Sequence, residues 1–317
     1  MTPAGKLPQQ EWLTALETCA LVAALTAGGD AVRFVGGCVR DAVAGRPVKD
    51  IDLATPSPPE QVTALLERAG IKAVPTGIEH GTVTAVVDHL PFEITTLRRD
   101  LETDGRRAKV AFTDDWAADA ARRDFTMNAL SCAPDGTLYD PFDGLADLRA
   151  GRVRFVGDPR ARIEEDYLRL LRFFRFQAHY GHEPPAPALL AVAMEMAPGL
   201  ANLSGERLRQ ETLKLLEAPQ PLPALEAMIA CGVAAHYLPE VESADSLAAY
   251  LALEDADAAP DPLLRLAALL PEGGAGATVA RRLRLSRAET TRLIALTAPE
   301  AKPLPDEPAA LRRRRIY

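Results

Sequence analysis

The stretch "FVGGCVRDAVAGRPVKDIDLAT" (residues 34–55) places a Gly-Gly pair and an Asp-x-Asp pair within one short segment. Gly36 and Gly37 follow an apolar run, and Asp50 comes thirteen residues after the second glycine. Because successive side chains of a strand point to opposite faces, a strand over "DIDLAT" directs Asp50 and Asp52 to the same face. The segment therefore predicts two neighbouring carboxylates beside a glycine turn.

The two aspartates predict a metal site. Neighbouring carboxylates repel each other, and each raises the pKa of the other unless a cation lies between them. Mg²⁺ is such a cation, since it prefers carboxylates together with the phosphate oxygens of a substrate. An exposed strand end is the plain alternative for a lone Asp-x-Asp. We take Asp50 and Asp52 as the catalytic and metal-binding pair because of the residues that precede them.

Gly36 and Gly37 lie between an expected strand, "AVRFVG", and an expected short helix, "GCVRDAVAG". Glycine lets a phosphate approach backbone N–H groups, and the start of a helix favours an anion. Arg40 adds a guanidinium one turn further on. A tight turn alone is the plain alternative, but with the aspartates nearby we expect these three residues to bind a nucleoside triphosphate. The segment matches neither G-x-G-x-x-G nor G-x-x-x-x-G-K-[ST], which disfavours a nicotinamide site and a P-loop.

Strand patterns lie in the first half of the chain. The segments "IKAVPTG", "GTVTAVVD" and "PFEITTLR" are rich in β-branched residues and predict strands. We expect helices over residues 9–27 and 117–130, and a mobile loop over residues 99–110, which are charged and contain a glycine.

From Pro159 onward helical patterns dominate. Residues 160–180 predict one long amphipathic helix. Further helices are expected at 186–197, 204–217, 221–231, 244–253, 262–270, 276–283 and 286–297. The chain is therefore expected to be an α+β protein. We divide it into a head (residues 1–150), a helical neck (151–220) and a helical body (221–317).

Charge is distributed unevenly along the 317 residues, whose net charge is −8. Residues 151–182 contain seven arginines and four acidic residues, a local basic segment that could hold phosphates. Residues 240–262 contain seven acidic residues and no Lys or Arg, so we do not expect this segment to contact a polyanion. No apolar run reaches the length of a membrane span. The N-terminus lacks a basic segment followed by an apolar one, which favours a cytoplasmic protein.

The order of the motifs resembles the class II tRNA nucleotidyltransferase and bacterial poly(A) polymerase family, within the DNA polymerase β-like nucleotidyltransferase superfamily. G-G-x-V-R-D and D-I-D open the match. The later segments are "FEITTLR" (92–98), "DGRR" (104–107) at the family's flexible loop, "RRDFTMNAL" (122–130), "YDPFDGLADLRAGRVRFVGDP" (139–159) and "EEDYLRLLRFFRF" (164–176). The resemblance implies a nucleotidyltransferase α/β head with a mixed sheet, followed by an all-helical neck and body.

The resemblance also implies roles for Arg123, Asp124 and Asn128, which would bind the ribose and triphosphate of the nucleotide. The spacing of Asp124 and Asn128 places them one turn apart on a helix. Without the resemblance, an exposed polar helix face is the simpler interpretation. Glu93 is either a third metal-facing carboxylate or a charge at a strand end, and the sequence leaves both open.

Asp166 and Arg169 lie three residues apart, on one face of the expected long helix. Arginine offers hydrogen-bond donors and aspartate offers acceptors, so together they can imitate the edge of a base. The resemblance implies that this pair selects C or A without a template, with Glu165 bracing the arginines. A surface ion pair is the plain alternative. Arg172 is placed with the nucleotide-binding residues, and contact with RNA phosphates or solvent stays open for it.

The activity implied by the resemblance is attack of an RNA 3′-hydroxyl on the α-phosphate of CTP or ATP, with Mg²⁺ as cofactor. In the family the substrate is tRNA and the product ends in CCA. A poly(A) polymerase or an A-only enzyme of the same family stays open. A CC-only enzyme is disfavoured because "DGRR" is retained. A non-catalytic RNA-binding protein is the alternative of a different class.

Members of the family continue well past the position of Tyr317, and "LRRRRIY" has no helix stop signal, so the sequence leaves open whether the chain is truncated within a helix. The sequence does not predict an oligomeric state.

Overall fold

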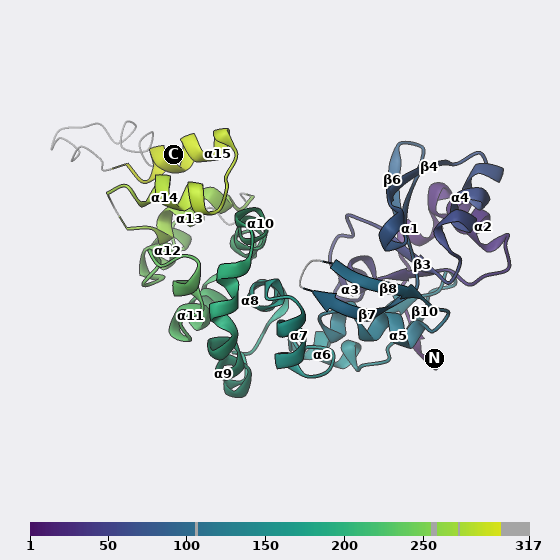
Figure 1. Ribbon diagram of the computed structural model, residues 1–317, viewed down its shortest axis with the longest axis horizontal. Helices are drawn as coiled ribbons and strands as arrows, with labels where there is room; N and C mark the ends of the chain where they lie inside the picture. The colour runs from purple at the N-terminus through teal and green to yellow at the C-terminus, as the bar shows by residue number, and fades with distance from the viewer. Residues whose placement is uncertain (105–106, 255–258, 272, 299–317) are drawn as a thin grey trace. The chain divides into compact units, whose positions relative to one another are not determined.

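The structure, a computed structural model, describes most of the chain (Figure 1). The described residues are 1–104, 107–254, 259–271 and 273–298. The chain divides into two compact units, Met1–Val192 and Ala193–Tyr317, called here the first and the second unit. The finer division at residues 150 and 220 stays a prediction. The expected helical end at "LRRRRIY" lies outside the described residues.

An eight-stranded sheet organises the first unit. Its strands run in the order β1 (Pro3–Lys6), β10 (Thr137–Tyr139), β9 (Ser131–Cys132), β2 (Arg33–Val35), β3 (Asp52–Thr55), β6 (Leu90–Thr96), β5 (Thr82–Val87) and β4 (Lys72–Gly77). Only β3 and β6 pair in parallel among these neighbours, and the other pairs are antiparallel. The predicted α+β class with a mixed sheet is confirmed.

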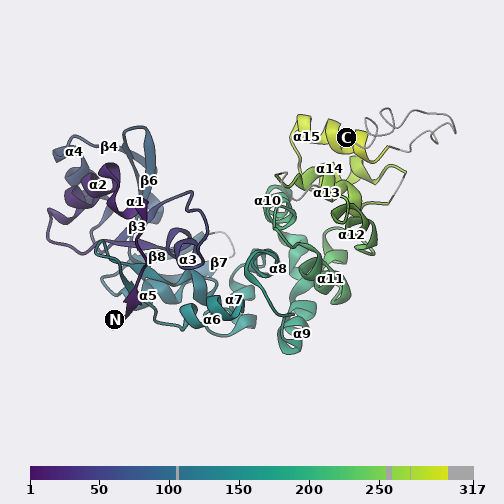
Figure 2. The same ribbon diagram turned by 180° about the vertical axis from the view of Figure 1, so that it is seen from behind.

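Alternation along the strands places apolar side chains under helices. Val83 of β5 and Ile94 of β6 are buried, whereas Glu93 between buried neighbours is exposed. The helices α2 (Leu16–Thr26) and α4 (Pro59–Arg68) pack together and against this part of the sheet (Figure 2). This packing leaves the polar side of β3 and β6 available for the site.

The first unit contains further helices. They are α1 (Glu11–Thr14), α3 (Gly37–Val43), α5 (Trp116–Ala121), α6 (Gly144–Ala150), α7 (Pro159–Glu165), α8 (Leu168–Tyr180) and α9 (Pro187–Met196), which runs into the second unit, and the 3₁₀ turns η1 (Ile78–His80) and η2 (Thr126–Asn128). The helix expected over residues 9–27 is interrupted at Ala15, whose φ of −59° and ψ of 143° lie outside the helical region.

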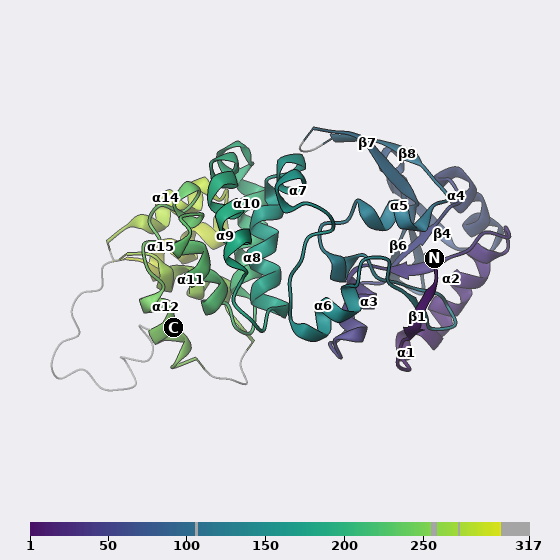
Figure 3. The same ribbon diagram turned by 90° about the horizontal axis from the view of Figure 1, so that it is seen from below.

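The loop expected over residues 99–110 is wrong. This segment forms two antiparallel strands, β7 (Arg98–Asp104) and β8 (Arg107–Phe112), which run side by side (Figure 3). The ladder reaches from the pair Arg98–Phe112 to the pair Asp104–Arg107. Backbone groups make a ladder, so a charged sequence does not prevent it. The "DGRR" segment lies partly outside the described residues, at positions 105–106.

A cluster of phenylalanines joins α8 to the segments that contain Phe125 and Phe155. The ring centroids of Phe125 and Phe155 are 4.8 Å apart, and those of Phe125 and Phe176 are 4.9 Å apart. Phe173 continues the cluster at 6.0 Å from Phe155. All four side chains are buried. Aromatic residues are sparse in this chain, and their concentration here fixes α8 to the segment that contains Phe125.

The second unit is helical in the part that the structure describes. Its elements after α9 are η3 (Ala197–Asn202), α10 (Gly205–Leu216), α11 (Leu222–Ala230), η4 (Ala234–His236), α12 (Asp245–Leu251), α13 (Pro262–Leu269), α14 (Ala275–Arg282) and α15 (Arg287–Leu296). The seven helices expected after residue 186 are confirmed. None of the described helices is long and apolar enough to cross a membrane.

Candidate active site

The glycine turn connects β2 to α3, as predicted. Gly36 has φ 68° and ψ −121°, a backbone conformation that side chains rarely adopt. A Cβ atom on Gly36 would lie 2.8 Å from Nη1 of Arg123. A Cβ atom on Gly37 would meet its nearest neighbour, Nη2 of Arg40, at an ordinary 3.7 Å. The backbone conformation therefore requires Gly36, and a side chain at this position would also displace the end of the Arg123 side chain.

Two of the three predicted carboxylates lie side by side on parallel strands. Asp52 of β3 and Glu93 of β6 are partners in the register. The prediction that Asp50 and Asp52 share one strand is wrong, because β3 begins at Asp52. The partner strand β2 ends at Val35, before the glycine turn, so the ladder does not continue to Asp50.

Asp50 nevertheless acts on the same site. Burial first, and then repulsion by the carboxylates of Glu93 and Asp50, raises the pKa of Asp52 to about 6. The guanidinium of Arg123 opposes this shift. Burial is the largest of these causes and the repulsion from Asp50 is the smallest.

The donor set fits a hard divalent cation. Within the described residues, no group of three or more His, Cys, Asp or Glu side chains forms a ready metal cluster. Mg²⁺ does not require one, because it commonly keeps several waters and takes one or two carboxylates together with substrate phosphates. The crowding that raises the pKa of Asp52 is relieved by such a cation.

The helix expected over residues 117–130 is wrong in its second half. α5 ends at Ala121, and a 3₁₀ turn covers Thr126–Asn128. The backbone between these two elements forms hydrogen bonds with a segment further along the chain. Val156 N–H donates to the carbonyl of Asp124, and Thr126 N–H donates to the carbonyl of Arg154, each at 3.0 Å. The burial of Phe125 in the aromatic cluster holds this extended segment.

Asp124 and Asn128 still meet, although not on a helix. Asn128 Nδ2 donates to Asp124 Oδ1 at 2.8 Å, and Phe125 N–H donates to the same oxygen at 2.9 Å. Arg172 of α8 donates through Nε to Asp124 Oδ2 at 2.7 Å. Burial of Asp124 opposes ionisation, but Arg172 and Asn128 outweigh it, and the pKa of Asp124 is lowered. The carboxylate is therefore ionised, with two donors on Oδ1 and the Arg172 guanidinium on Oδ2.

Arg123 is held from two sides. Its Nη2 lies 3.4 Å from the buried carboxylate of Asp119, and its Nη1 donates to the carbonyl of Asn128 at 3.3 Å. Asp119 also pairs with Arg122 at 2.8 Å. Burial of Asp119 is outweighed by the two arginines, which lower its pKa. Asp119 is not among the residues predicted from the sequence. Its spacing of three and four residues from these arginines is typical of ion pairs on a helix and could have identified it.

The single helix expected over residues 160–180 is wrong. Asp166 separates α7 from α8 with φ −159° and ψ 107°. Its carboxylate accepts from Leu168 N–H at 3.1 Å and its carbonyl accepts from Arg169 N–H at 2.9 Å, so it caps the second helix. Asp166 and Arg169 thus remain neighbours at a helix start, not on one helix face.

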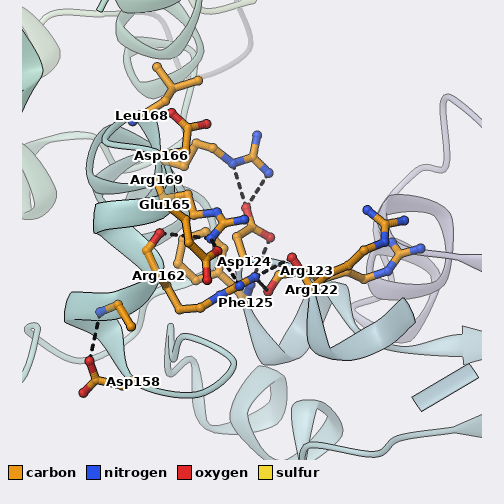
Figure 4. Close-up of polar contacts among 12 residues, drawn as sticks. Arg122, Arg123, Asp124, Phe125, Asp158, Arg162, Glu165, Asp166, Leu168 and Arg169 are labelled. Carbon is orange, nitrogen blue, oxygen red and sulfur yellow. Dashed lines mark hydrogen bonds and ion pairs between the residues drawn. The ribbon is translucent and has the colours of Figure 1, made fainter. Parts of the chain in front are cut away.

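Glu165 braces two arginines, as predicted (Figure 4). It accepts from Arg162 Nη1 at 2.5 Å and from Arg169 Nη1. Arg169 Nη1 also donates to the carbonyl of Arg162 at 2.9 Å. Arg162 was not identified from the sequence, although it stands three residues before Glu165.

Arg162 links α7 to the segment after α5. Its Nη2 donates to the carbonyl of Arg123 at 2.7 Å and to that of Arg122. The predicted residues therefore form two connected groups. One contains the carboxylates, the glycine turn and Arg123. The other contains Asp166 and Arg169, and Arg162 joins it to the first.

Arg40 lies within the first unit's interior and makes contacts of its own. Nε and Nη2 donate to Asp41, each at 2.9 Å, and Nη1 donates to Asn128 Oδ1 at 2.7 Å. The predicted contact of Arg40 with a triphosphate stays a prediction.

We predict that the two glycines differ in their tolerance of a side chain. Gly36→Ala should lower the free energy of unfolding by about 1–3 kcal/mol, because it strains the backbone and displaces Arg123. Gly37→Ala is the matched control and should leave the free energy of unfolding nearly unchanged. Chemical denaturation of the purified variants measures both, and equal losses would contradict the assigned role of the turn.

Two family models match parts of the chain. Residues 32–154 match the model of the "Poly A polymerase head domain" family. Residues 185–245 match a second model, "Probable RNA and SrmB- binding site of polymerase A".

Relatives of established name are similar along much of the chain. The "CCA tRNA nucleotidyltransferase 1, mitochondrial" of Danio rerio is 40% identical over 262 residues, which are 81% of this chain and 61% of that protein. The "CCA-adding enzyme" of Streptococcus gordonii is 41% identical over 220 residues, covering 69% of this chain and 54% of that protein. The chain thus spans less than two thirds of either relative.

A solved structure shares the fold. The CCA-adding enzyme of Bacillus stearothermophilus in complex with CTP superposes with a TM-score of 0.69 at 30% identity, covering 90% of this chain and 66% of that one. The glycine turn, the carboxylates and the "RRDFTMNAL" segment all lie within residues 32–154, which match the head model. Through residues 32–154, the chain belongs to the poly A polymerase head domain family.

Proposed function

We propose that this protein is a CCA-adding tRNA nucleotidyltransferase, which adds CMP and AMP to the 3′ end of tRNA and releases pyrophosphate. One observation carries the proposal: Asp52 and Glu93 are paired across parallel strands, with Asp50 acting on Asp52, and Arg123 lies against the nearby Gly36. This arrangement combines carboxylates for a cation with a backbone turn and a guanidinium for phosphates. The named activities of the relatives support the same choice.

Each residue has a distinct task in this proposal. Asp50 and Asp52 would hold Mg²⁺, with Glu93 as a third nearby carboxylate. When bound, the cation activates the RNA 3′-hydroxyl and offsets charge on the transferring phosphoryl group. The turn at Gly36 and Gly37 lets the triphosphate approach the backbone.

The remaining residues orient the nucleotide and offset its charge. Arg123, held by Asp119, offsets the negative charge of the phosphates. Asp124 and Asn128 hold the ribose, and Arg172 keeps Asp124 in place. The RNA 3′-hydroxyl releases its proton to water, its oxygen forms a bond to the α-phosphorus, and the bond to the bridging oxygen breaks as pyrophosphate leaves.

Base selection is assigned to Asp166 and Arg169. Glu165 and the carbonyl of Arg162 both contact Nη1 of Arg169, which fixes the side chain. The guanidinium carries more donors than these contacts use, so Nε and Nη2 can face a base edge. Asp166 supplies acceptors one turn away. A rigid pair of this kind can select C and A without a template strand.

The substrates of the protein follow from the same proposal, whereas its location in the cell does not. The substrates are tRNA, CTP and ATP. The cytoplasmic location stays a prediction, because the relatives include a protein named as mitochondrial and streptococcal proteins. A poly(A) polymerase or an A-only enzyme of the same family would use the same residues, and so the product distinguishes them.

We predict that the product of the reaction is a discrete C-C-A addition. The protein is incubated with Mg²⁺, CTP, ATP and a tRNA that lacks its 3′ end, and the products are sequenced. A long A tail would assign the chain to the poly(A) polymerases. Addition of a single A only to a tRNA ending in CC would indicate an A-only enzyme, and no addition would favour the RNA-binding alternative.

We predict that Asp50→Asn and Asp52→Asn each lower the rate of nucleotide incorporation about a thousandfold, since a bound cation contributes several kcal/mol to such a step. Asp135→Asn is the matched control, because Asp135 is exposed and pairs only with Lys6 among the described salt bridges. Thermal unfolding checks that the variants remain folded. Wild-type incorporation by a folded Asp52→Asn protein would exclude the proposed metal site.

A further inference from the structure

A ring of hydrogen bonds joins α3, the Asp124–Asn128 segment and α8. Tyr180 donates through its hydroxyl to Asp41 Oδ1 at 2.6 Å. Arg40 donates to both oxygens of Asp41 at 2.9 Å and, through Nη1, to Asn128 Oδ1 at 2.7 Å. The first half of the ring therefore leads from the end of α8 to the side-chain oxygen of Asn128.

The second half returns to α8. Asn128 Nδ2 donates to Asp124 Oδ1 at 2.8 Å, and Arg172 Nε donates to Asp124 Oδ2 at 2.7 Å. Arg172 and Tyr180 lie eight residues apart on α8, which is about two turns. Phe176 lies between them, with the guanidinium carbon of Arg40 5.1 Å and that of Arg172 5.6 Å from its ring centroid.

The ring is balanced and largely buried. Two carboxylates, of Asp41 and Asp124, face two guanidiniums, of Arg40 and Arg172. Side-chain exposure is 12% for Arg40, 21% for Asp41, 9% for Asp124 and 30% for Arg172. In such surroundings a complete network is rigid, and an incomplete one is costly.

The ring fixes the orientation of one amide. The oxygen of Asn128 accepts from Arg40, and its nitrogen donates to Asp124. A rotation of the amide by half a turn would place nitrogen against the Arg40 guanidinium and oxygen against the Asp124 carboxylate, so both bonds would be lost. Asp41 and Tyr180 touch neither of these atoms, but they hold the guanidinium that does.

We propose that Asp41 and Tyr180 are positioning residues for recognition of the nucleotide sugar. They hold Arg40, and Arg40 fixes the amide of Asn128 that meets the ribose. The inference rests on the proposed function, which places the ribose at Asp124 and Asn128. A 2′-hydroxyl both donates and accepts hydrogen bonds, so its recognition requires an amide of fixed orientation. Asp41 and Tyr180 therefore control the preference for ribonucleotides over deoxyribonucleotides.

The test compares CTP with 2′-deoxy-CTP as substrates. The measured quantity is the ratio of kcat/KM for the two, which we call the sugar preference. Asp41→Asn should lower the sugar preference about tenfold, because it removes a charged hydrogen-bond partner of Arg40. Tyr180→Phe should lower it about threefold, because it removes one neutral donor.

Matched controls come from the second unit. Glu240 accepts from Arg282 at 2.5 and 2.7 Å, so Glu240→Gln disturbs a similar arginine–carboxylate pair. Tyr237→Phe removes a buried hydroxyl that contacts Thr212. Both controls should leave the sugar preference unchanged. Asp41→Asn should have no further effect on it in an Asn128→Ala background, since the two residues act through one amide.

Two results would overturn the inference. One is an equal fall in kcat/KM for both sugars in a folded Asp41→Asn or Tyr180→Phe protein, which would indicate a structural role only. The other is an additive effect of Asp41→Asn and Asn128→Ala on the sugar preference. If Asp41→Asn does not fold, Tyr180→Phe decides.

Failure of the proposed function is a separate outcome. It would be seen as no incorporation by the wild-type protein. The sugar preference is then measured as the ratio of the dissociation constants of CTP and 2′-deoxy-CTP, by calorimetry. Equal ratios in the wild type and in both ring variants would overturn the inference at that stage.

Discussion

The arrangement of the site depends on the hydrogen bonds and the ion pair of the buried Asp124 carboxylate. A buried carboxylate is costly unless hydrogen bonds and a cation satisfy it. Asp124 obtains these from Phe125 N–H, from Asn128 and from Arg172. Since Arg172 belongs to α8, satisfying this one group brings a helix from later in the chain against the segment that holds Asp124 and Asn128, the residues proposed to bind the ribose.

The aromatic core and the polar contacts both hold the segment around Asp124 against α8. Phe125 follows Asp124 directly and packs on Phe155 and Phe176, which fixes the backbone on which Asp124 stands. Arg162 adds a second connection, from α7 to the carbonyls of residues 122 and 123. The head strands and the first neck helices are thus one physical unit, and the proposed sugar and base contacts belong to the same network.

Short sequence patterns predicted those parts of the site that form from residues close together in the chain. The turn at Gly36 and the presence of strands at β3 and β6 follow from nearby residues and were predicted, although β3 begins two residues later than expected. Helix ends near the site were predicted poorly, because distant contacts decide them. α5 ends at Ala121, shortly before Phe125, which packs in the aromatic core. α8 begins after Asp166, whose carboxylate accepts a hydrogen bond from Leu168 N–H. Asp50 lies outside β3 because its neighbour β2 ends first. Neither the pairing of Arg40 with Asn128 nor that of Arg172 with Asp124 leaves a local pattern in the sequence, since 88 and 48 residues separate the partners.

The central claim is that one site holds the triphosphate at the glycine turn and the cation at the paired aspartates. A crystal structure of the protein with a non-hydrolysable CTP analogue and Mn²⁺ tests this most directly. The account predicts an anomalous Mn²⁺ peak between Asp50 and Asp52, with the triphosphate over Gly36 and Gly37 and the ribose against Asn128. A nucleotide bound elsewhere, or a peak away from these two aspartates, would contradict it.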